Sequence, residues 1–73
     1  MDGLGFDFEM EVEAAVRAIR TYPKSAVEIV PGYRRKLLQT FPYGVVYRER
    51  AEEILIVAIA QLQRRPDYWL DRL

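Results

Sequence analysis

An apolar stripe at helical spacing occupies the first third of this chain and ends just before a proline. Its members recur at intervals of three and four residues, which is the period of one face of an amphipathic helix. Acidic residues dominate the first half of the segment and arginines its end, an arrangement that the helix dipole favours. We predict a helix from about Phe6 to Thr21, because Pro23 cannot continue it. The apolar positions are Phe8, Val12, Ala15, Val16 and Ile19.

The next part of the chain is typical of short strands separated by turns. A short extended piece is expected at Ala26–Val30, and the turn dipeptide Pro31-Gly32 closes it. Residues 33–40 and 43–49 are predicted to form two strands, of which the second is rich in β-forming residues. The turn between them falls at Phe41-Pro42, because proline cannot donate to a strand ladder.

The run Ile54–Ala60 is apolar at every position, as a central strand covered on both faces would be. A buried helix is the competing interpretation of this run. A basic and aromatic tail follows from Gln61, with a short helix expected from Asp67. One main amphipathic helix packed on a three- to four-stranded antiparallel sheet makes this an α+β fold.

Composition limits the chemistry that the chain can perform. It contains neither cysteine nor histidine, which excludes disulfides, the usual zinc sites and catalysis by Ser-His-Asp or Cys-His sets. We expect no cofactor and no metal. No apolar run reaches the roughly 18 residues of a membrane span, and the acidic N-terminus lacks signal-peptide features, so a cytoplasmic protein is expected. Its 73 residues form one domain (1–73), whose small core favours association with another chain.

The formal net charge of zero hides an uneven distribution. Residues 1–28 contain six acidic and three basic residues, whereas residues 29–73 contain eight basic and five acidic ones. The basic excess is concentrated in the run Pro31–Arg48, which has no acidic residue. This pattern indicates a local basic surface rather than a strongly basic nucleic-acid-binding protein.

Alternation along a strand divides the basic run between two faces. Arg34 and Lys36 are expected on one face, and Arg35 on the other with Tyr33 and Leu37, while the register decides which set Arg48 joins. The functional interpretation is a phosphate- or carboxylate-binding patch that uses bidentate guanidinium contacts. The alternative is a solvated sheet face whose arginines only protect an edge from aggregation.

The C-terminal segment combines the same residue types. Arg64, Arg65, Tyr68 and Trp69 lie within six residues, a combination suited to base stacking and phosphate contact in single-stranded RNA. The alternative is that the aromatic rings fold back onto the core. We expect Trp69 to be a core residue and leave Tyr68 open.

These residues offer few groups that could act as a general base. Without histidine, a general base must be a carboxylate, a lysine or a tyrosine. Of the two lysines, Lys24 and Lys36, only Lys36 lies within the basic run. Arginine stabilises negative charge but hardly removes a proton. The sequence therefore favours a charge-stabilising site over a proton-transfer site.

Four segments, in this order, resemble the RelE/ParE family, the toxins of type II toxin–antitoxin modules. They are Leu4–Val16, which is similar to the second helix of that family, the basic run Pro31–Arg48, the apolar run Ile54–Ala60 and the ending Arg64–Trp69. The resemblance implies a helical hairpin packed on an antiparallel sheet, and a role in growth inhibition and plasmid stabilization. It also implies a cognate antitoxin that binds the toxin in the cytoplasm and holds it inactive.

Two activities occur in that family. The Phe-Pro-Tyr hairpin and the Arg-Arg-Pro-x-Tyr-Trp ending look more like the ParE branch, which poisons DNA gyrase and is not a nuclease. A ribosome-dependent, metal-independent mRNA endoribonuclease of the RelE type is the alternative, so enzymatic activity stays open. The resemblance implies target contacts through Arg34, Arg35, Lys36, Arg48, Arg64, Arg65 and Tyr68. A nuclease pattern would fall on Arg35 (or Arg34), Lys36, Arg48, Arg65 and Tyr68.

The chain departs from the family at its start, because members usually begin with a strand and a first helix that are not seen here. We therefore expect an uncovered sheet edge, filled by an antitoxin segment or by a second copy in a homodimer. An inactive remnant that only binds an antitoxin is a further alternative. Under either active hypothesis, the cations at positions 34–36, 48 and 64–65 are expected to converge on one exposed surface.

Overall fold

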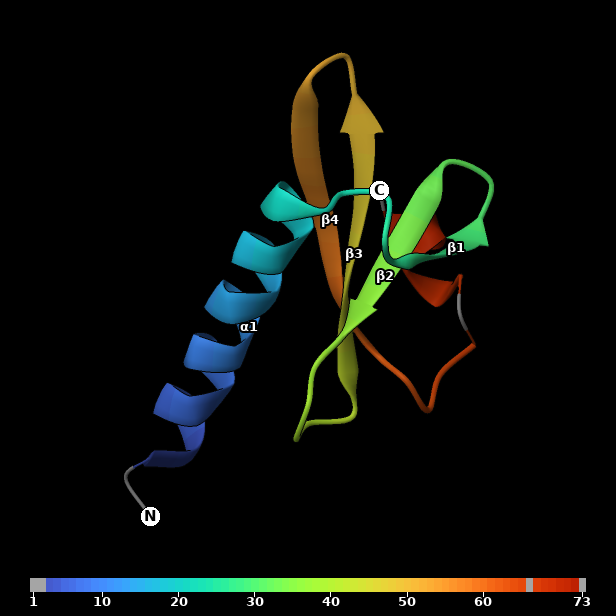
Figure 1. The fold of residues 1–73 in the computed structure, drawn as a ribbon. Coiled ribbons are helices and arrows are strands. Elements are labelled where there is room, and N and C mark those ends of the chain that lie inside the picture. The colour runs from blue at the N-terminus through green and yellow to red at the C-terminus, as the bar shows by residue number, and fades with distance from the viewer. Residues whose placement is uncertain (1–2, 66, 73) are drawn as a thin grey trace.

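The structure, a computed structural model, describes residues 3–65 and 67–72. One long helix lies beside a four-stranded antiparallel sheet with the strand order β1-β2-β3-β4 (Figure 1). The elements are α1 (Gly3–Thr21), β1 (Val27–Val30), β2 (Tyr33–Leu37), β3 (Tyr43–Arg50), β4 (Glu53–Gln61) and the 3-10 helix η1 (Tyr68–Arg72). The expected α+β class is confirmed. No helix in the described ranges is both long enough and apolar enough to span a bilayer.

The apolar stripe of α1 packs on one face of the sheet, as its spacing predicts. Ala15 and Ile19 are buried there against Val45 and Tyr47 of β3, and Leu38 closes the cluster. The helix begins at Gly3, earlier than expected, and ends at Thr21 as predicted. The hydrophobic stripe therefore positions α1 across the middle of the sheet.

The short helix η1 lies on part of the opposite face of the sheet (Figure 1). Trp69 is 3% exposed and packs with Val46 and Ala60, which confirms the expectation that Trp69 is a core residue. Because side chains alternate along a strand, β3 sends Val45 and Tyr47 towards α1 and Val46 towards η1. Strand β3 is one of the two inner strands, and these three residues are fully buried.

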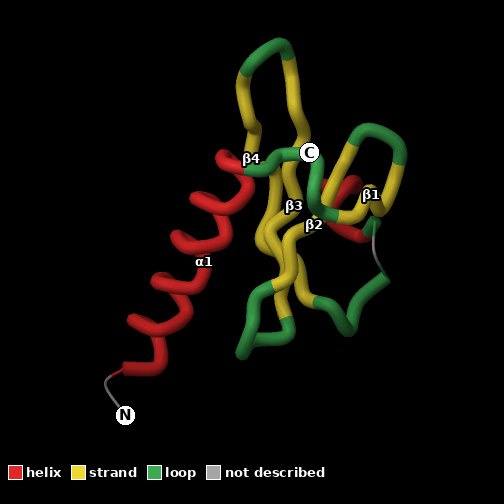
Figure 2. The backbone as a smooth tube through the Cα atoms, in the orientation of Figure 1, coloured by secondary structure: helices red, strands yellow, loops and turns green. Residues whose placement is uncertain are grey.

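The apolar run near the C-terminus is a strand, β4, so the interpretation of this run as a buried helix is wrong. The expectation that it is central and covered on both faces is also wrong. Successive hairpins place the last strand at the edge of the sheet, and Leu55, Ile56 and Ile59 are 37%, 41% and 38% exposed. In Figure 2 the β3–β4 hairpin projects beyond the β1–β2 pair.

The strand expected at residues 33–40 ends at Leu37, because the chain turns there into a tight loop. The amide of Leu38 donates to the carbonyl of Tyr43, and the amide of Tyr43 donates to the carbonyl of Phe41. The Glu11 carboxylate on α1 accepts hydrogen bonds from the two amides that follow Leu38, which are those of Gln39 at 3.0 Å and Thr40 at 3.1 Å. The loop is thus held to the helix.

Candidate functional site

Strand β2 divides the cationic residues between the two faces of the sheet. Arg34 and Lys36 pair with Tyr47 and Val45, and all four lie on the α1 side. Arg35 pairs with Val46 and lies on the η1 side. The alternation expected from the sequence is present, but the cations at positions 34–36 therefore do not share one surface.

The guanidinium of Arg34 is bound to main-chain carbonyls of the segment that follows α1. Its Nη1 donates to the carbonyl of Ala26 at 2.7 Å and to that of Lys24 at 3.3 Å. Both contacts come from Nη1, so the two N–H groups of this nitrogen are used within the fold. Arg34 thus links β2 to the segment that connects α1 and β1.

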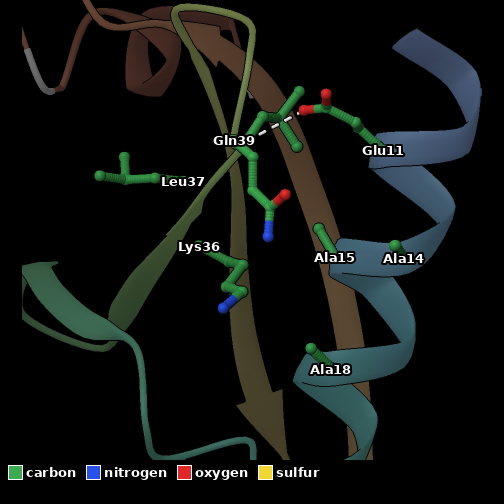
Figure 3. A pocket seen from close by; sticks show the side chains of 8 residues that line it. Glu11, Ala14, Ala15, Ala18, Lys36, Leu37 and Gln39 are labelled. Atoms are coloured by element: carbon green, nitrogen blue, oxygen red, sulfur yellow. Dashed lines mark hydrogen bonds between the residues drawn. The ribbon is translucent and has the colours of Figure 1, made fainter. Parts of the chain in front are cut away.

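Lys36 lines a hollow of about 200 Å³ between α1 and β2. Figure 3 shows it with Gln39 on the strand side and with Ala14, Ala15 and Ala18 on the helix side. The wall is mainly short apolar side chains, and Glu11 at its rim is already hydrogen-bonded to loop amides. Among the described residues that line this hollow, Lys36 is the only cation, and the Glu11 carboxylate already accepts hydrogen bonds from the loop.

Arg48 lies on the η1 face and is supported by aromatic rings. Its Cζ is 5.2 Å from the centroid of the Tyr33 ring, and its Nη1 donates to the Tyr33 hydroxyl at 3.3 Å. The Tyr33 ring lies 5.0 Å from that of Trp69. A guanidinium over an aromatic face gains cation–π attraction, so Tyr33 fixes the position of Arg48.

Arg35 extends along the same face over Gly44. A Cβ at position 44 would lie 2.6 Å from Cγ and 2.8 Å from Cδ of Arg35. Glycine therefore makes room for the Arg35 stem, which explains why this position near the start of β3 carries no side chain. The register sets the close approach, so the sequence pattern alone does not reveal it.

Two donors on this face are unsatisfied. The Nε atoms of Arg35 and Arg48 are buried and have no hydrogen-bond partner within the described part of the chain. A buried donor without a partner costs about 1–3 kcal/mol. Arg35 and Arg48 therefore each carry a donor that the fold itself does not satisfy.

The C-terminal segment adds a third cation to the η1 face. The Cζ of Arg64 lies 4.2 Å from the centroid of the Tyr68 ring, and Tyr68 packs with the Val46 cluster. Arg65 forms an ion pair with Asp67 at 3.4 Å. The half-buried Tyr68 has its hydroxyl engaged, since it accepts a hydrogen bond from the amide of Gln61 at 3.0 Å.

We call this surface the arginine–aromatic face. Its members are Tyr33, Arg35, Arg48, Arg64, Tyr68 and Trp69. Among the residues that the structure describes, no carboxylate lies within 4.0 Å of the Arg35, Arg48 or Arg64 guanidinium. Three cations without local neutralisation attract anions. Sequence reasoning named all three but missed that Tyr33 supports Arg48 and that Gly44 admits Arg35.

Comparison with protein-family models, curated proteins and solved structures finds no match to this chain. The RelE/ParE resemblance therefore stays a hypothesis.

Proposed function

We propose that this protein is a growth-inhibiting toxin of RelE/ParE type that acts by binding, not cleaving, an anionic macromolecular target. The observation that carries the proposal is the pair of arginines, Arg35 and Arg48, whose Nε donors are buried without partners on a face bordered by aromatic rings. DNA gyrase is the target that we favour, with a cognate antitoxin as the neutralising partner in the cytoplasm.

Binding is favoured over cleavage because the residues of a nuclease pattern are not gathered on one surface. Lys36, the only lysine of the basic run, lies on the α1 side, whereas Arg35 and Arg48 lie on the η1 side. The Tyr68 hydroxyl accepts a hydrogen bond from the amide of Gln61. Proton transfer at a phosphate needs groups within hydrogen-bond reach of one reacting atom, and this arrangement supports charge recognition better.

The geometry also supports recognition of extended acidic surfaces. Arg35 lies towards Gly44, while Arg48 stacks on Tyr33 and Arg64 on Tyr68, so the three guanidiniums are distributed over the face. Guanidinium groups pair with carboxylates and phosphates through parallel hydrogen bonds. Aromatic residues and arginine together supply the contacts that most often dominate the energy of protein interfaces.

Inducible expression in bacterial cells without an antitoxin tests the proposal. We expect the wild-type chain to arrest growth and the double variant Arg35→Ala/Arg48→Ala to lose that effect. The control is Arg17→Ala/Arg20→Ala, which removes the same charge from exposed positions on α1 and is expected to remain toxic. Circular dichroism of the purified variants checks that each is folded.

Two further assays identify the activity. A purified gyrase supercoiling assay should show inhibition by the wild-type chain, and primer extension on cellular mRNA should show no new cleavage sites. Growth arrest with mRNA cleavage and normal supercoiling would replace the gyrase proposal with the endoribonuclease alternative. No growth defect from well-expressed, folded protein would leave only an inert antitoxin-binding module.

A further inference from the structure

The two edges of the sheet differ in how well they are protected against pairing. Strand β1 has four residues, carries Glu28 and has an irregular register between Glu28 and Val30. Strand β4 has nine residues and is uninterrupted by charge or proline from Ile54 to Ala60. Proteins usually protect an open edge with lysine, proline or shortness. The β4 edge has none of these over that run.

A bulge in β4 determines which of its side chains share a face. Tyr47 pairs with Ile56 and Val45 pairs with Ile59, so Val57 is the extra residue. Ile56 and Ile59 therefore both lie on the α1 side of the sheet, although they are three positions apart. They are exposed at the edge. On the opposite side, Leu55 and Ala60 share the η1 face, because they pair with Arg48 and Gly44.

One end of the β4 edge is already closed. The amide of Gln61 donates to the Tyr68 hydroxyl at 3.0 Å, so this amide cannot donate to the backbone of another strand. The open part of the edge runs from Glu53 to Ala60 and is almost entirely apolar. An extended strand with apolar side chains on both faces is therefore the chemistry that fits it.

We propose that the β4 strands of two copies of this chain pair antiparallel about a two-fold axis, joining two sheets into one. Side chains that oppose each other across paired strands must lie on the same face. The register that places Ile56 opposite Ile59 of the second copy, and Leu55 opposite Ala60, meets this condition on both faces. Because the axis makes every pair reciprocal, each exposed isoleucine covers its counterpart.

The charges at the two ends of β4 favour a second copy in this orientation. Glu52 and Glu53 lie at its start, and Arg64, which has no carboxylate within 4.0 Å among the described residues, follows its end. Antiparallel pairing brings the acidic end of one strand towards the basic end of the other, whereas parallel pairing would oppose glutamate to glutamate. The β4 segment is thus complementary to itself in charge as well as in apolar character.

The pairing does not depend on the proposed function. If that function holds, the pairing would strengthen binding to the target. A two-fold axis perpendicular to the joined sheet keeps both arginine–aromatic faces on the same side. A target with two acidic sites would then meet two copies at once, and the second contact forms at a high effective concentration.

Sedimentation equilibrium of the full-length chain, with no target present, tests the pairing. We expect a dimer across the micromolar range for the wild type, and a dissociation constant raised by roughly tenfold or more for Ile56→Lys and for Ile59→Lys. The control Val27→Lys changes a 71%-exposed residue at the other edge and should remain dimeric. A wild-type chain that stays monomeric at all concentrations would overturn the proposal.

Cross-linking tests the register and does not require the lysine variants to fold. The chain has no cysteine of its own, so single cysteines report only on the designed positions. A mixture of Ile56→Cys and Ile59→Cys chains should form a mixed disulfide under mild oxidation, and Val27→Cys chains should not. Equal cross-linking through Val27 would show that the contacts are non-specific and would contradict the β4 interface.

Discussion

The hydroxyl of Tyr47, on the inner strand β3, donates a 2.6 Å hydrogen bond to the carbonyl of Pro23, just after α1. Tyr47 is fully buried. Together with the bonds from Arg34 to the carbonyls of Lys24 and Ala26, this contact ties the segment between helix and sheet to the strands. Polar side chains of the sheet therefore position the helix, in addition to the apolar stripe.

Removing this hydroxyl should weaken the fold without opening a large cavity. We expect Tyr47→Phe to lower the free energy of unfolding by about 1–2 kcal/mol, because the carbonyl of Pro23 loses its donor. Urea unfolding followed by circular dichroism measures this change. Tyr22→Phe is the control, since Tyr22 is 67% exposed, and it should change little. Equal effects of the two substitutions would contradict a specific role for the Tyr47 bond.

Stability at alkaline pH should also depend on Tyr47. Burial raises the pKa of Tyr47 above its ordinary value of 10.0, with a smaller opposing effect from Arg34. In the unfolded chain the hydroxyl ionises near pH 10, while in the folded chain it stays protonated to higher pH. The unfolded state then binds fewer protons, so the stability that Tyr47 contributes is present below about pH 10 and declines above it.

Urea unfolding at a series of pH values from about 8 to 11 measures this decline. The stability difference between the wild type and Tyr47→Phe should shrink as the pH rises above 10. A difference that stays constant over that range would show that the ionisation of Tyr47 is not linked to folding.

Neighbouring arginines on β2 should have opposite roles. Arg34→Ala should destabilise the protein by about 1.5–3 kcal/mol, because it leaves the carbonyls of Lys24 and Ala26 without their charged donor. Arg35→Ala removes a buried, unpartnered Nε, which favours stability, and also the packing of the Arg35 stem over Gly44, which lowers it. Because these effects oppose each other, we expect a smaller loss than on Arg34→Ala, together with weaker target binding. Thermal unfolding and the growth assay, applied to both variants, separate the two roles; a stability loss on Arg35→Ala as large as that on Arg34→Ala would reject the distinction.

A side chain at Gly44 should displace Arg35. The added Cβ of Gly44→Ala would lie less than 3.0 Å from the Arg35 stem, so we expect a loss of about 1–3 kcal/mol from overpacking. The double variant Gly44→Ala/Arg35→Ala should recover most of that loss, because the clash is then absent. Additive losses in this double-mutant cycle would show that the two positions are not coupled.

The β2–β3 loop should depend on the carboxylate of Glu11. Glu11→Ala removes the acceptor of the Gln39 and Thr40 amides, and we expect a loss of about 0.5–2 kcal/mol, similar to the loss of a helix cap. Hydrogen exchange at these two amides should become faster. Glu13→Ala, an exposed change on the same helix, is the control and should leave the exchange rates of the two amides unchanged.

Features governed by local periodicity were predictable from the sequence. The three-and-four spacing from Phe8 to Ile19 places the buried stripe of α1, and the two-residue alternation of β2 separates Arg34 from Arg35. The β character of the run 54–60 also follows from its composition. Each of these depends on neighbours within a few positions, so the sequence alone contains the information.

Tertiary structure decided the position of β4 and the neighbours of the arginines. The order of the strands places β4 at an edge, although its apolar run is typical of a central strand. The cross-strand register sets Arg48 beside Tyr33 and Arg35 over Gly44, and the bulge at Val57 brings Ile56 and Ile59 onto one face. Register and order arise from contacts between segments far apart in the chain, and no local pattern determines them.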